Sequence, residues 1–221
     1  MKSHHEPAVV QRQWPEILDK FTYGAENEEC RFIFKRDAFV SKQIERKVRD
    51  PIAINLLFHE ARHMVIDSLY PCNADDAVYL AAILMQLTYG DHKPNVHREG
   101  FLVDGLAPFI PKHLLRKSSD ASASMWEAKI LAGHKQYAGK NDKTILHLLY
   151  LQYVWQWPIY GSVFFYGTME APQVGTVMRE MPDIEVRVGV TTDGVHIVNE
   201  QTNQLVHSFH YDVRLGARGH V

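Results

Sequence analysis

The pentapeptide His59–His63, HEARH, contains residue types at a spacing that could do chemistry. It fits the pattern H-E-x-x-H, in which two histidines one helical turn apart bind Zn²⁺ and the glutamate between them polarises a metal-bound water. In that interpretation His59 and His63 are zinc ligands and Glu60 is the general base. A zinc metallohydrolase is therefore one hypothesis for the function.

A catalytic zinc also needs a third protein ligand, and the sequence offers none in a recognisable pattern. The extended metzincin pattern requires glycine and histidine where this chain has Ile66 and Leu69. The downstream Asp75 and Asp76 are explained by the start of the next helix, where acidic residues are favourable. Because a pattern with three fixed positions recurs by chance, we expect no metal, no cofactor and no catalytic residue here.

The residues around the pentapeptide predict the helix that positions it. Asp50 is a favourable N-cap, and Pro51 occupies the first helical position, where its missing N–H costs nothing. At about 100° per residue, one broad face of this helix is apolar and both histidines fall on the opposite face. The apolar face comprises Ala53, Ile54, Leu57, Phe58, Ala61, Met64 and Val65. The histidines are thus predicted to point away from the core.

Elsewhere the chain changes from a helical to a strand pattern near Pro158. A helix that starts near Asn73 and stops at Gly90 is apolar nearly all round, which predicts a buried central helix. Other predicted helices are Trp14–Leu18 (one short turn), Leu106–Arg116 (interrupted by Pro111), Met125–Tyr137 and Lys143–Gln156. Predicted strands are Arg31–Lys35, Ser162–Thr168, Ile184–Val190, Val195–Asn199 and Leu205–Tyr211, with a hairpin turn at Asp193-Gly194. Helices followed by an antiparallel sheet indicate the α+β class.

Composition excludes several classes of protein. The 221 residues are 46% apolar and 23% charged, without the run of roughly 18 apolar residues that predicts a transmembrane helix. No signal peptide is expected, and two lone cysteines, Cys30 and Cys72, suit a reducing cytosol. The net charge of −2 and the lack of a recognised motif argue against a nucleic-acid partner.

Positive charge is nevertheless concentrated between Arg31 and Arg49, where seven basic residues accompany only Asp37 and Glu45. This excess predicts a surface for an acidic partner or an anionic membrane, although a solvated linker is the alternative interpretation. The candidate partner-binding residues are Lys35, Arg36, Arg46, Lys47 and Arg49.

The strands at the end of the chain have no covering helix, and three or four such strands do not close a stable sheet-based domain. We therefore expect a fragment, a short isoform or a lobe completed by something else. We also expect weak stability and self-association through an exposed sheet edge.

Several segments, in this order and spacing, resemble the FERM domain. They are WPEIL, RFIFKRD, DPIAINLLFHEARHMVI, YPC, AAILMQLTYGDHKP, HREGFL, LAPFIPKHLLRK and WPIYGSVFFYG. The resemblance covers about Gln11–Leu215. It implies three parts: residues 1–40 as the remnant of a ubiquitin-like first lobe, 41–158 as a helical acyl-CoA-binding-protein-like second lobe, and 159–221 as an incomplete PH/PTB-like third lobe.

The resemblance also implies a function. FERM proteins of this type are non-enzymatic adaptors that link membrane receptor tails or Ras-like small GTPases to junctional or cytoskeletal signalling partners. A cytoplasmic protein, peripheral at the plasma membrane or at cell junctions, is the corresponding expectation. In such proteins the positions of HEARH carry no metal.

Overall fold

The chain divides into two compact units, Met1–Lys35 and Arg36–Val221. The structure, a computed structural model, describes residues 6–21, 29–31, 35–102, 105–116, 120–170 and 183–211. The first unit contains α1 (Pro7–Arg12) and α2 (Trp14–Phe21). The helical turn predicted at Trp14–Leu18 is confirmed as part of α2. The strand predicted at Arg31–Lys35 lies mostly outside the described residues.

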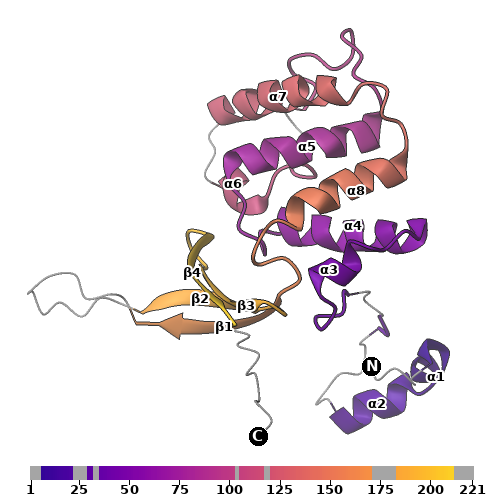
Figure 1. The fold of residues 1–221 in the computed structure, drawn as a ribbon, viewed down its shortest axis with the longest axis vertical. Coiled ribbons are helices and arrows are strands. Elements are labelled where there is room, and N and C mark those ends of the chain that lie inside the picture. Colours follow the sequence, from indigo (N-terminus) through magenta and orange to yellow (C-terminus); the bar gives the residue numbers. More distant parts are fainter. Residues whose placement is uncertain are drawn as a thin grey trace, which may run out of the picture. The chain divides into compact units, whose positions relative to one another are not determined.

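The second unit begins with helices (Figure 1). They are α3 (Lys42–Glu45), α4 (Pro51–Ile66), α5 (Ala74–Tyr89), α6 (Lys112–Arg116), α7 (Asp120–His134), the 3₁₀ helix η1 (Lys135–Tyr137) and α8 (Lys143–Val154). The four long helices stack in the order α7, α5, α8, α4, so that α5 contacts both α7 and α8. We call this part of the unit the helical part.

The ends of the two predicted long helices are set by the residues that the sequence indicated. Asp50 caps α4 by accepting a hydrogen bond from the Ala53 N–H at 2.8 Å. Asn73 and Asp76 form a reciprocal capping box at the start of α5, in which the side chain of each residue accepts a hydrogen bond from the backbone N–H of the other. Gly90, with φ 69°, follows the last residue of α5, as predicted.

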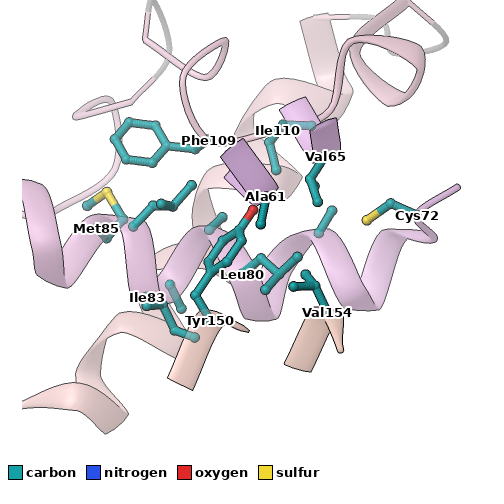
Figure 2. Packing of buried hydrophobic residues seen from close by; sticks show 14 of the residues in the cluster. Ala61, Val65, Cys72, Leu80, Ile83, Met85, Phe109, Ile110, Tyr150 and Val154 are labelled. Atoms are coloured by element: carbon teal, nitrogen blue, oxygen red, sulfur yellow. The ribbon is translucent and has the colours of Figure 1, made fainter. Parts of the chain in front are cut away.

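The hydrophobic core is centred on α5, which confirms the prediction of a buried central helix. Leu80, Ile83 and Met85 of α5 are each at most 1% exposed. Figure 2 shows them beside Tyr150 of α8 and Ala61 of α4. Because α5 is apolar nearly all round, it packs against helices on more than one side.

Two predicted helix boundaries are wrong. Residues 107–110 form turns, and α6 begins only at Lys112, because Pro111 cannot donate a helical hydrogen bond and instead accepts at the start of the new helix. The helix predicted from Met125 begins at Asp120. Neither difference moves a candidate site residue.

The second unit ends in a four-stranded antiparallel sheet with the strand order β1-β2-β3-β4. The strands are β1 (Val163–Met169), β2 (Ile184–Val190), β3 (Gly194–Asn199) and β4 (Gln204–His210). The four strands predicted after Pro158 are thereby confirmed, and so is the α+β class. Every residue of β4 is exposed, whereas Val198 of β3 is fully buried within the hydrophobic core.

Candidate partner-binding site

The HEARH segment lies on α4 with both histidines exposed, as the helical pattern predicted. His63 Nδ1 lies 2.9 Å from the Asp67 carboxylate, and the Glu60 carboxylate accepts the backbone N–H of Arg36 at 2.6 Å. These side chains therefore serve the fold. Within the part of the chain that the structure describes, no three His, Cys, Asp or Glu side chains are arranged to hold a metal ion. The zinc-hydrolase hypothesis thus receives no support from this geometry.

Arg36, one of the five predicted binding residues, points into the protein. Its side chain is only 8% exposed and forms an ion pair with Glu45. The guanidinium also donates to the carbonyls of Val40 and Gly161 and lies 5.3 Å from the ring centre of Tyr160. Burial opposes its charge, but the hydrogen bond to Glu45 and the charge of that carboxylate raise the pKa of Arg36 above its usual value. Arg36 is therefore a buried structural residue beneath the site, and its guanidinium is not exposed to a partner.

Glu45 is the buried centre of this arrangement. It lies on α3, and its side chain is 3% exposed. One carboxylate oxygen accepts from Arg36, and the other accepts from the indole N–H of Trp155 (2.9 Å) and from the hydroxyl of Tyr160. Burial, followed by the charge of Glu45, raises the pKa of Tyr160, so this hydroxyl remains a donor. Glu45 thereby fixes α3 against the end of α8.

The remaining predicted cations point outward. Arg46, Lys47 and Arg49 are exposed, and none of them forms an ion pair with a carboxylate among the described residues. Arg46 donates to the Trp155 carbonyl at 3.2 Å, and Arg49 donates to the carbonyls of Arg46 and Val48 at 2.9 Å each. These contacts orient the guanidinium groups without neutralising them. Lys35 is also exposed and belongs to the first unit.

A pocket of about 300 Å³ opens beside these cations. Its lining residues come from α3, the end of α8 and the turn between β2 and β3: Ser41, Lys42, Gln43, Arg46, Trp155, Gln156 and Asp193. Lys42 Nζ lies 3.2 Å from the Asp193 carboxylate. Although burial raises the pKa of Asp193, the hydrogen bond and charge of Lys42 outweigh burial and lower it.

Sequence reasoning did not include Lys42 and Asp193 among the site residues. Lys42 was one cation of the basic stretch, and Asp193 was assigned only to a hairpin turn. Nothing in the sequence joins these positions, because they are 151 residues apart (193 − 42).

Exposed apolar side chains accompany the cations, and the sequence analysis missed these too. Phe39, in the turn before α3, is 93% exposed, and Ile44 on α3 is 60% exposed. Ile52, in the first turn of α4, is 72% exposed. Large apolar groups that remain in water among unpaired cations are typical of an interaction surface.

A helical part followed by an antiparallel sheet, as seen here, is shared with solved FERM domains. The complex of the FERM and C-terminal domains of Drosophila Merlin aligns with a TM-score of 0.55 at 18% identity, covering 78% of this chain and 52% of that one. The human myosin 7b C-terminal MyTH4-FERM domain, solved with the harmonin-a PDZ3 domain, aligns with a TM-score of 0.54 at 20% identity, covering 73% and 31%. These likenesses establish the fold.

The sequence itself establishes the family. Residues 43–165, more than half of the chain, match the FERM central domain, and the chain therefore belongs to the FERM family. Human FERM domain-containing protein 8 is 26% identical over 234 residues, covering 93% of this chain and 48% of that protein. Dictyostelium discoideum FERM domain-containing protein B is 29% identical over 197 residues, covering 89% and 40%. The chain spans about half the length of the curated relatives it matches or less.

FERM domain proteins serve as adaptors and scaffolds. No helix in the described ranges has both the length and the apolar character needed to cross a bilayer.

Proposed function

We propose that this chain is a non-enzymatic FERM-type adaptor. It links membrane receptor tails or Ras-like small GTPases to junctional or cytoskeletal signalling partners, in the cytoplasm and peripherally at the plasma membrane or cell junctions. Membership of the FERM family supports this proposal, and so do the Merlin and myosin 7b domains, each solved in a complex with another protein domain.

The proposal extends to the organisation of the chain. Residues 1–40, 41–158 and 159–221 correspond to a ubiquitin-like remnant, an acyl-CoA-binding-protein-like lobe and a partial PH/PTB-like lobe. The motifs WPEIL, DPIAI and HREGFL further suggest kinship with the Krev-interaction-trapped scaffold of cerebral cavernous malformation.

The partner docks on what we call the α3 surface, made of Phe39, Ile44, Arg46, Lys47 and Arg49. The observation that carries this assignment is the combination of three cations without carboxylate partners among the described residues and two apolar side chains at least 60% exposed. Cations that no internal carboxylate neutralises are available to an acidic partner and accelerate its association. The apolar groups supply surface whose burial favours the bound state.

An acidic protein surface is the favoured partner. The pocket beside Arg46 contains the Lys42–Asp193 ion pair, which offers a second polar contact to a protein group entering it. An anionic membrane would use the same cations, with Phe39 and Ile44 at the lipid interface. Lys35 belongs to the first unit and is not part of this surface.

Reversing the charge of the α3 surface tests the proposal. The triple variant Arg46→Glu, Lys47→Glu, Arg49→Glu is titrated against Ras-like GTPases, against acidic receptor-tail peptides and against vesicles containing anionic lipids. We expect binding to weaken roughly tenfold or more at low salt, since three favourable charge contacts become repulsive.

The matched control makes the same change of charge on exposed lysines elsewhere in the helical part, namely Lys93→Glu, Lys129→Glu and Lys135→Glu. It should keep its affinity. Equal weakening by both triple variants would show a general charge effect and remove the assignment to the α3 surface. Loss of vesicle binding alone would identify the membrane as the partner.

A further inference from the structure

The pocket beside Arg46 contains two cations and one carboxylate. Lys42 of α3 and Arg46, the residue that ends α3, supply the positive charges, and Asp193 of the β2–β3 turn supplies the negative one. Lys42 Nζ lies 3.2 Å from the Asp193 carboxylate, whereas Arg46 forms no ion pair among the described residues. The pocket therefore already holds one anionic group and retains one cation that is not neutralised.

Arg46 can still receive an anion. One of its terminal nitrogens donates to the Trp155 carbonyl at 3.2 Å, and this contact holds the guanidinium at the wall of the pocket. A guanidinium has five N–H donors, so most of them remain for a ligand. Ser41 adds a hydroxyl whose oxygen accepts from the Ile44 N–H at 3.4 Å and whose O–H is left to donate. Several donors around one space suit an anion with several oxygens.

The Asp193 carboxylate can leave Lys42 without dismantling the pocket. The Asp193 side chain is 47% exposed, and an ion pair with such an exposed member contributes little to stability. Its carboxylate also accepts from the hydroxyl of the adjacent Thr192 at 3.1 Å, and the Tyr211 N–H donates to the Asp193 backbone carbonyl at 3.0 Å. The carboxylate can thus rotate while the turn stays in place. Lys42 is 17% exposed and keeps its contact with the Trp157 carbonyl at 3.4 Å.

Asp193 sets a threshold for any anion that enters the pocket. A carboxylate from a partner offers Lys42 one negative charge, which Asp193 already supplies from within the same chain. An intramolecular partner acts at an effective concentration of about millimolar, so a carboxylate gains little by replacing it. A phosphomonoester carries a charge of about −1.5 to −2 at pH 7 and three acceptor oxygens, so it can bond to Lys42 and Arg46 together.

The size and lining of the pocket restrict the source of the phosphate. The volume of about 300 Å³ accommodates one phosphorylated side chain. Apart from Trp155, which is 5% exposed, the lining is polar, so it suits phosphoserine or phosphothreonine better than the aromatic ring of phosphotyrosine. An inositol ring with several phosphates brings more negative charge than two cations neutralise. The favoured source is therefore a phosphorylated protein and not a lipid headgroup.

We propose that this pocket binds a phosphorylated serine or threonine side chain of the partner protein. Lys42 and Arg46 are the cations that hold the phosphate, and Ser41 donates its hydroxyl. Asp193 is an internal competitor that keeps unmodified carboxylates from occupying the pocket. The inference rests on the proposed adaptor function and narrows its partner from an acidic protein surface to a phosphorylated one.

The test titrates the whole chain with two blocked amino acids, N-acetyl-phosphoserine N-methylamide and N-acetyl-glutamate N-methylamide. Backbone amide NMR at neutral pH and low salt records the binding. We expect the phosphoserine compound to shift the signals of residues 41–46 and of Asp193. It should bind roughly tenfold or more tightly than the glutamate compound, since a phosphate satisfies both cations.

Two substitutions examine the roles within the pocket. Asp193→Asn preserves the turn, because asparagine followed by glycine is favoured in hairpins, and it removes the competing carboxylate. It should therefore raise the affinity for the phosphoserine compound roughly fivefold or more. Lys42→Met keeps the alkyl chain without the charge and should lower that affinity by a similar factor.

The matched controls remove the same charges from exposed positions outside the pocket. They are Glu185→Gln on β2 and Lys129→Met on α7, and both should leave the affinity for the phosphoserine compound within roughly twofold. Controls that change the affinity as much as the pocket variants would show a general charge effect and overturn the inference.

Other outcomes also overturn the phosphate pocket. They are equal affinity for the two compounds, no gain from Asp193→Asn, and binding of inositol trisphosphate without binding of the phosphoserine compound, which would assign the pocket to a lipid. If the phosphoserine compound does not bind while charge reversal on the α3 surface still weakens partner binding, the adaptor function stands and this inference fails. If the compound binds but charge reversal leaves partner binding unchanged, the pocket stands and the assignment of the α3 surface fails.

Discussion

At the scale of single residues, the buried carboxylate of Glu45 is predicted to contribute strongly to the free energy of unfolding. It is a buried carboxylate whose two oxygens accept from Arg36, Trp155 and Tyr160. Replacing it by glutamine leaves the Arg36 guanidinium buried without its counter-charge, which typically costs about 3–5 kcal/mol. We expect Glu45→Gln to lower the free energy of unfolding by about 3 kcal/mol, measured by urea denaturation.

The control for that measurement is Glu99→Gln. It removes the same charge from an exposed loop position and should change the free energy of unfolding by at most about 0.5 kcal/mol. Equal stability of the two variants would contradict a central role for Glu45.

His147 of α8 predicts a pH dependence of stability. Its ring stacks on Phe58 with centroids 4.1 Å apart, and burial, then the charges of His59 and Lys143, lower its pKa to about 4. Between the unfolded pKa of roughly 6.5 and about 4, the unfolded chain binds more protons than the folded one. Stability should therefore fall as the pH drops through this window.

The variant His147→Phe keeps an aromatic ring beside Phe58 but does not titrate. Its stability relative to the unsubstituted chain should rise as the pH falls from roughly 6.5 to 4, while His134 and His196, whose pKa values burial also lowers, titrate in both proteins. If thermal unfolding gave the same change of stability with pH for both proteins, His147 would not contribute to the pH dependence of stability.

At the scale of elements, β4 is the exposed edge of the sheet. Among the strands that the structure describes, it pairs with β3 alone, and Leu205, Val206 and Phe209 are between 38% and 56% exposed. An unprotected edge strand with apolar side chains is a template for pairing with a second chain. We expect concentration-dependent dimers in sedimentation velocity, and weaker dimers after Val206→Lys, because charge on an edge strand opposes pairing.

Met125→Lys is the comparison for this change. It places the same charge on an exposed apolar position of α7, away from the sheet, and should leave the association constant unchanged. A chain that stays monomeric at all concentrations would disprove edge pairing.

The helices and strands could be predicted from the sequence where local chemistry decides them. Asp50 with Pro51 marked the start of α4, and the alternation of Ile184–Val190 marked β2. Pro111 was also visible, but its effect was underestimated, since the segment before it forms turns rather than a helix.

The inward orientation of Arg36 could not be predicted. Arg36 and Lys47 occur in the same basic stretch, but Arg36 also contacts Tyr160 and Gly161, which are more than 120 residues away in the sequence. Charge patterns along a chain locate a basic surface but do not show which members face inward.

At the scale of the whole molecule, the helical part and the sheet of the second unit both line the pocket beside the proposed docking surface. The pocket beside Arg46 takes Lys42 from α3 and Asp193 from the β2–β3 turn, which form an ion pair across it. A partner that fills this pocket therefore contacts both parts at once. A partner bound there would stabilise, by mass action, the arrangement of the helical part and the sheet that forms the pocket.

The contacts of Glu45 with Arg36, Trp155 and Tyr160 also determine where a shorter fragment of this chain can begin. The match to the FERM central domain begins at residue 43, and a fragment excised at that point would lose Arg36 while retaining Glu45 in its buried position. Such a fragment would carry an uncompensated internal charge, although it respects the boundary of sequence similarity. The smallest autonomous piece of the second unit must instead begin at or before Arg36, so the folding boundary and the family boundary do not coincide.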